Sequence, residues 1–113
     1  MEIVFDNIIK ISTNKIYSGL HWKKRHDLKN SYKTLTNVIL NKIEPIEGKV
    51  DLHFNFYFKG KPLDSSNCSL MAKILEDCLV EKGILKDDKV ECVGKFTVES
   101  CKGDRDYCKL TIN

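Results

Sequence analysis

The stretch VDLHFNFYF, from Val50 to Phe58, decides the fold, because its side chains alternate between apolar and polar over nine positions. The side chains expected on one face are Val50, Leu52, Phe54, Phe56 and Phe58, and those expected on the other are Asp51, His53, Asn55 and Tyr57. A period of two residues is typical of a β-strand that buries one face against a core. Whatever covers the apolar face must come from the segments on either side.

Two helices are predicted by apolar residues that recur every three or four positions. The first covers residues 24 to 42, with an apolar stripe formed by Leu28, Tyr32, Leu35 and Ile39. The second covers residues 66 to 82, where Ser65 or Ser66 is expected to cap the free N–H groups and Gly83 to end the helix. Both can pack an apolar stripe on the strand from Val50 to Phe58.

Shorter β-rich segments predict the remaining strands. Residues 2 to 11 predict a first strand, broken near Asn7, and residues 89 to 99 and 106 to 112 predict a final antiparallel pair around a turn at residues 102 to 104. The order is then β-α-β-α-β-β. We therefore expect an α+β fold, a small mixed β-sheet with two helices packed on it, in a single domain over residues 1 to 113.

Charge is distributed unevenly along the chain, although its net value is only +3. Residues 10 to 33 contain seven Lys or Arg and one acid, Asp27, whereas most acids lie between Glu44 and Glu99. A basic region that attracts phosphates and an acidic region that attracts a metal ion would produce this pattern. A solvated helix face would produce the basic run as well.

Composition also bears on the compartment. No apolar run approaches the roughly 20 residues of a membrane span. The opening MEIVFDNIIKI has acids where a signal peptide would be basic, so neither a membrane partner nor export is expected. The five cysteines are odd in number and form no CxxC motif, which favours the reducing cytoplasm.

Carboxylates are concentrated between Asp64 and Asp88, on both sides of the second predicted helix. At 100° per residue, one polar face of that helix holds Ser66, Ser69, Lys73, Glu76 and Asp77. Carboxylates held close together repel one another unless a cation neutralises them, and Mg²⁺ prefers oxygen ligands. Such an ion can activate water and stabilise charge on a phosphate. Taken singly, these residues would also suit a turn, an ordinary ion pair and a solvated loop.

The same residues carry a resemblance to a known family. The string Asp64-Ser65-Ser66-Asn67, followed by Lys73, Glu76-Asp77, Leu79, Gly83 and Asp87-Asp88, resembles the core signature of the RusA family of Holliday-junction resolvases. That signature is a D-x-D-N loop, a helix with Lys and then Asp, and a DD loop. The N-terminal segment Asn14-Lys15-Ile16-Tyr17, with His21-Trp22 and Arg25, is similar to the Asn- and aromatic-containing loop of the family.

The resemblance implies a homodimeric, Mg²⁺-dependent endonuclease of phage type that nicks four-way DNA junctions and can also accept Mn²⁺. Its catalytic residues would be Asp64, Asp88 and Lys73, and its metal ligands Asp64, Asp88, Asp87 and Asp77. Ser66 stands where the family has a second Asp, so Glu76, Asp77 or Asp87 would have to compensate. Expected contacts to branched DNA are Asn14, Lys15, Tyr17, His21, Trp22, Lys23, Lys24, Arg25, Lys29 and Asn67.

Two other classes remain open. A non-catalytic protein that binds branched DNA would keep the basic face and have a metal site decayed at Ser66. A structural or protein-interaction module would bind neither metal nor DNA. DNA binding measured against salt separates the last class from the other two.

Overall fold

The computed structural model describes residues 1–13 and 22–113. Its strands are β1 (Glu2–Asp6), β2 (Val50–Phe58), β3 (Val93–Lys102) and β4 (Tyr107–Ile112), and its helices are α2 (Trp22–Leu40), the 3₁₀ helix η1 (Ser65–Cys68) and α3 (Ser69–Glu81). The predicted order and the α+β class are confirmed. In β2 every even-numbered side chain is buried and every odd-numbered one is half-buried, as the alternation predicts.

The four strands form one mixed sheet in the order β1-β4-β2-β3. β2 is parallel to β3 and antiparallel to β4, and β4 is antiparallel to β1. The predicted pairing of residues 89–99 with residues 106–112 is therefore wrong, because β2 lies between β3 and β4. The physical reason is that the chain leaves β2, crosses over through α3 and returns beside β2 in the same direction.

A short connection then carries the chain from β3 across the end of β2 to β4. The N–H of Gly103 donates to the carbonyl of Phe58 at 2.8 Å, and the N–H of Lys59 donates to the Asp106 carboxylate at 2.9 Å. A Cβ atom on Gly103 would lie 2.8 Å from the Cβ of Tyr57. Glycine therefore allows the crossing segment to lie directly against β2.

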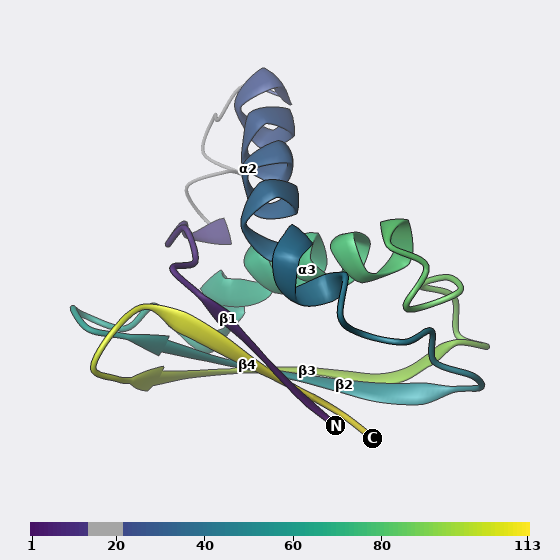
Figure 1. Ribbon diagram of the computed structural model, residues 1–113. Helices are drawn as coiled ribbons and strands as arrows, with labels where there is room; N and C mark the ends of the chain where they lie inside the picture. The colour runs from purple at the N-terminus through teal and green to yellow at the C-terminus, as the bar shows by residue number, and fades with distance from the viewer. Residues whose placement is uncertain (14–21) are drawn as a thin grey trace.

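Helices α2 and α3 lie on the same face of the sheet (Figure 1). Tyr32 of α2 is fully buried, and its hydroxyl donates to the carbonyl of Ile9 at 2.6 Å, which fixes α2 to the segment after β1. That segment begins at Asn7, where the predicted break appears as a left-handed residue with φ of 57°. Gly83, with φ of 75°, lies just beyond the end of α3, as expected.

The start of α3 differs from the prediction. Neither η1 nor α3 has a side-chain cap from its own N-cap residue, so Ser65 and Ser66 do not fulfil this role. Instead the Thr13 hydroxyl accepts a hydrogen bond from the N–H of Leu70 at 2.9 Å. A distant residue thus satisfies one of the free donors of the helix, which a local cap rule cannot foresee.

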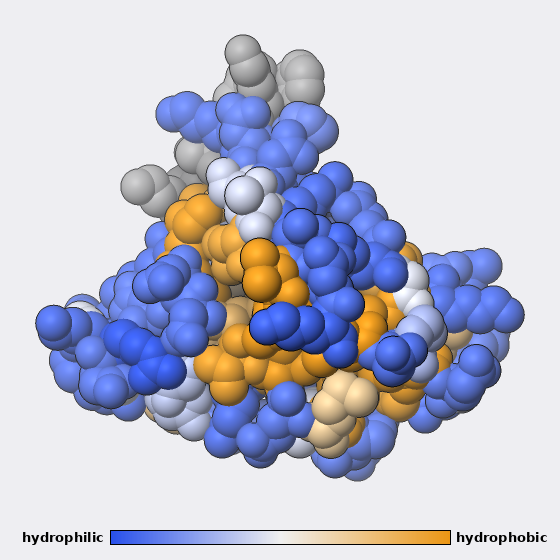
Figure 2. All heavy atoms as spheres, in the orientation of Figure 1, coloured by the Kyte–Doolittle hydropathy of each residue, from blue (hydrophilic) through white to orange (hydrophobic). Residues whose placement is uncertain are grey.

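The core lies between the sheet and the helices. Figure 2 shows hydrophobic residues gathered in this zone, with hydrophilic residues around them. Fully buried side chains from both layers include Phe54, Phe56, Phe58, Met71 and Leu75. None of the described helices is both long and apolar enough to cross a membrane.

Candidate metal and nucleic-acid site

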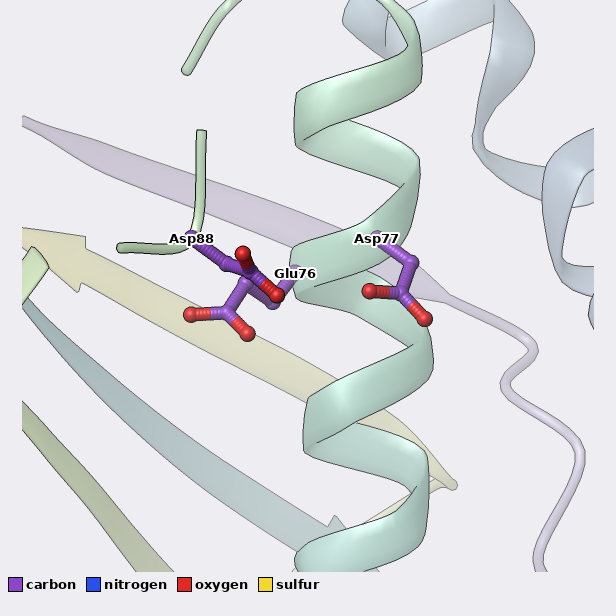
Figure 3. A group of neighbouring side chains, drawn as sticks. All are labelled: Glu76, Asp77 and Asp88. Carbon is purple, nitrogen blue, oxygen red and sulfur yellow. The ribbon is translucent and has the colours of Figure 1, made fainter. Parts of the chain in front are cut away.

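Three carboxylates converge beside α3. Glu76 and Asp77 belong to α3, Asp88 lies on the following loop, and one oxygen from each lies within 4.8 Å of the others (Figure 3). We refer to these three residues as the acidic cluster. The loop turns back because Ile84 and Leu85 are buried and their N–H groups both donate to the carbonyl of Leu79. Apolar burial therefore brings Asp88 to the polar side of the helix.

Lys73 lies one turn before the cluster and contacts all three of its members. Its Nζ atom is 2.8 Å from Glu76, 3.3 Å from Asp77 and 2.6 Å from Asp88. Partial burial alone would lower the pKa of Lys73, but the hydrogen bonds to Asp88 and Glu76 outweigh it and raise this pKa. The hydrogen bond from Lys73 likewise lowers the pKa of Asp88. Three carboxylates thus share one ammonium, and these four groups together carry a formal charge of −2.

Glu76 is the buried member, with 4% of its surface exposed. A buried carboxylate needs a partner, and Lys73 provides one. Asp87 points elsewhere: its Oδ1 accepts the N–H of Asp88 at 2.7 Å, and its Oδ2 lies 3.5 Å from Lys89. Asp87 is outside the acidic cluster and orients the loop that carries Asp88.

The donor set of the acidic cluster fits a hard divalent cation. All of its ligand atoms are carboxylate oxygens, and Lys73 already shows that a cation is stabilised at their centre. Mg²⁺ in proteins is bound by one or two carboxylates and retains several waters, so three converging carboxylates are sufficient. The acidic cluster is therefore a group that could hold a metal ion.

Asp64 does not join this group. It is exposed and precedes η1, where its carbonyl accepts the N–H of Asn67. Glu76 lies seven residues into α3, roughly 10 Å along the helix axis from its start. The D-S-S-N string and the acidic cluster thus occupy different turns of this segment. Asn67 is half-buried, and its carbonyl accepts a hydrogen bond from Thr13.

The basic residues of α2 divide into two sets. Lys24 and Arg25 are exposed. Lys29 instead lies 3.3 Å from Asp77, and Lys33 lies 3.1 Å from Glu81, so these two link α2 to α3. Trp22 and Lys23 open α2, whereas Asn14, Lys15, Tyr17 and His21 lie outside the described residues.

Two hollows flank the acidic cluster. A groove of about 420 Å³ is lined by Thr13, Arg25, Ser69, Leu70, Lys73, Glu76 and Phe96, and we call it the Phe96 groove. A cleft of about 260 Å³ between α2 and α3 reaches Asp77, Asp88, Lys29 and Lys33. Lys73 and Glu76 therefore face one hollow, and Asp77 and Asp88 face the other. Phe96 was not among the predicted site residues.

Neither a model of a known protein family nor a curated protein matches the sequence. The resemblance to the RusA family therefore rests on the residues quoted above.

Proposed function

We propose that this chain is a RusA-like endonuclease that hydrolyses phosphodiester bonds of four-way DNA junctions, as a homodimer and with Mg²⁺. The observation that supports this most is the convergence of Lys73, Asp77 and Asp88, which the resemblance picked out, with Glu76 as a further carboxylate. Glu76 also supplies a carboxylate that Ser66 cannot, which answers the main departure from the family pattern.

In this proposal Glu76, Asp77 and Asp88 hold Mg²⁺, or Mn²⁺ in its place. The bound ion would supply charge stabilisation at the scissile phosphate and a source of activated water. The three carboxylates carry a formal charge of −3 without Lys73, and the ion would neutralise two of these charges. The ion would then replace Lys73 as their main counterion, and the flexible, half-exposed side chain of Lys73 could turn to a phosphate.

The exposed cations of α2 would bind the DNA backbone. Lys24 and Arg25 have no acidic partner among the described residues, whereas Lys29 faces Asp77 and would be released only if that carboxylate took a metal ligand role. Contacts of this kind position DNA without reading its sequence.

A second candidate function is binding of branched DNA without cleavage. The observation in its favour is that Lys73 already neutralises part of the acidic cluster, so the fold does not need a metal ion to hold these carboxylates together. Ser66 at the family's Asp position fits this decayed site as well.

Cleavage of a synthetic four-way junction across a Mg²⁺ and Mn²⁺ series distinguishes the two. We expect the parent to nick the junction, and Asp88→Asn to stop nicking while junction binding persists. Asp104→Asn is the matched control, because Asp104 is an exposed acid that pairs with Arg105 away from the cluster. Asp64→Asn tests the remaining predicted ligand separately.

Three results are decisive. Nicking by the parent that is lost only in the cluster variants supports the endonuclease. Binding by the parent with nicking only after Ser66→Asp supports the decayed site. Absence of both binding and nicking under every metal overturns both functions. Sedimentation at micromolar concentration tests the homodimer, which paired nicks on a two-fold symmetric junction require.

A further inference from the structure

Phe96 is an apolar aromatic side chain that the fold leaves partly exposed. It lies on β3, which is an edge strand, and its register partner Leu52 places it on the face that carries the helices. Its ring packs against Phe54 at a tilt of 45°, with ring centroids 5.1 Å apart. Even so, 37% of Phe96 is exposed, while Phe54, Phe56 and Phe58 are fully buried. An aromatic ring that packs on the core and is still partly exposed can receive another flat group.

The neighbours of Phe96 in its groove indicate the chemistry of that group. Arg25 and Lys73 line the Phe96 groove, and Glu76, the only carboxylate among the described residues that line it, is buried and paired with Lys73. An apolar aromatic surface beside two cations matches a nucleotide, in which a flat base is attached to an anionic phosphate. A purely apolar ligand would leave Arg25, which has no acidic partner among the described residues, without a counter-charge.

The Phe96 groove also connects directly to the acidic cluster. Lys73 and Glu76 line the groove and contribute to the cluster, so a phosphate bound at Lys73 would lie between the metal ligands and the ring of Phe96. The base attached next to that phosphate would then be directed along the groove. A base in an intact duplex is covered by its neighbours on both faces, so only an unpaired base can stack here.

We infer that Phe96 is a stacking platform for one unpaired nucleobase beside the phosphate held by Lys73 and Arg25. This inference rests on the proposed function and deepens it, because it assigns recognition of a branch point to an unpaired nucleotide. Phe96 would act as a positioning and specificity residue and would take no part in the chemistry.

The test combines a protein change with a DNA change. The parent and Phe96→Leu are titrated, in Ca²⁺ to limit cleavage, with a four-way junction carrying one unpaired nucleotide at its centre. Each is also titrated with the same junction whose unpaired nucleotide is abasic, and with a plain duplex. Phe96→Tyr keeps a flat ring, and Tyr107→Leu removes an aromatic ring from the opposite face of the sheet, where Tyr107 stacks on Tyr57.

Stacking on one aromatic side chain predicts that Phe96→Leu weakens binding of the junction about tenfold. The abasic junction and the duplex should bind the parent and Phe96→Leu equally, and Phe96→Tyr and Tyr107→Leu should match the parent. The loss of affinity caused by Phe96→Leu must disappear when the base is absent, because the protein change and the DNA change are coupled if the ring contacts the base. Thermal melting confirms that each variant folds, and Phe96→Met replaces Phe96→Leu if the latter does not.

Two failures are distinguishable. If the parent prefers the junction over the duplex but Phe96→Leu binds every DNA as the parent does, the platform is wrong and the proposed function stands. An equal loss on the base-containing and abasic junctions also overturns the platform, because it reveals a structural effect. If the parent binds no junction, the proposed function fails and the platform with it.

Discussion

Replacing Lys73 with methionine removes the ammonium that contacts all three carboxylates of the acidic cluster. Two unit charges 2.8 Å apart, as in the pair of Lys73 with Glu76, attract by about 6 kcal/mol at an effective dielectric constant of about 20. The Lys73 side chain is 47% exposed, so solvent screens this attraction and desolvation offsets more of it. We expect Lys73→Met to lower the free energy of unfolding by about 2 kcal/mol, because Glu76 is left buried and unpaired.

The assay is urea denaturation at pH 7 with and without Mg²⁺. Metal binding to the freed carboxylates should recover about 1.4 kcal/mol when the ion is present at ten times its dissociation constant. Glu76→Gln in the Lys73→Met background should recover stability without metal, because it removes the buried charge. Lys82→Met is the matched control, since the Lys82 ammonium donates to the neutral side chain of Asn41 and pairs with no acid among the described residues.

The reasoning is refuted if Lys73→Met is as stable as Lys82→Met and Mg²⁺ changes neither. The ammonium would then contribute nothing to holding the cluster, and the carboxylates would not behave as a metal site once it is gone.

Three further outcomes follow from the fold and its charges. Lys24→Glu combined with Arg25→Glu should weaken binding to any DNA and reduce the slope of log affinity against log salt by about two, one for each lost phosphate contact. The melting temperature should stay constant, because both residues are exposed. Burial raises the pKa of Cys108 above its unfolded value of 9.0, so the folded chain keeps a proton that the unfolded chain loses. Stability should therefore fall as pH rises above about 9, and urea denaturation of Cys108→Ala should show a shallower fall. Gly83→Ala should cost about 1 kcal/mol in the same assay, because φ of 75° strains any residue with a Cβ atom.

The sequence predicts best where one local pattern determines the structure. The alternation of β2 predicted both its limits and its buried face, and Asn7 and Gly83 predicted a break and a helix end. The pairing of the last two strands was wrong because closeness in the chain favours a hairpin. The crossover through α3 instead places β3 beside β2, which is a property of the whole topology.

In the candidate site too, local patterns predict some residues, whereas the position of others depends on the whole fold. Lys73 and Asp88 could be singled out by motif, and the structure brings them together with Asp77. Glu76 was assigned to the polar face of its helix, yet it is buried, because it lies one turn after Ala72 at the border of the apolar stripe. That spacing, with Lys73 three residues before it, is the signal that could have identified a buried ion pair. The exposure of Phe96 depends on which helices cover β3, and no local pattern carries that information.

The place of β4 in the sheet also determines when the sheet can be completed. β4 is the last of the described strands to be synthesised, yet it lies between β1 and β2 and is the only strand that β1 contacts in the described sheet. While the chain is still emerging from the ribosome, β2, α3 and β3 can assemble as a crossover unit, but one edge of β2 stays bare. β1, which is made before the other described strands, must wait for a partner that is more than a hundred residues away in the register pair Glu2 and Thr111. Closing so long a loop slows folding, so an incomplete chain exposes both an unpaired edge and the apolar face of β1 until synthesis has passed β4.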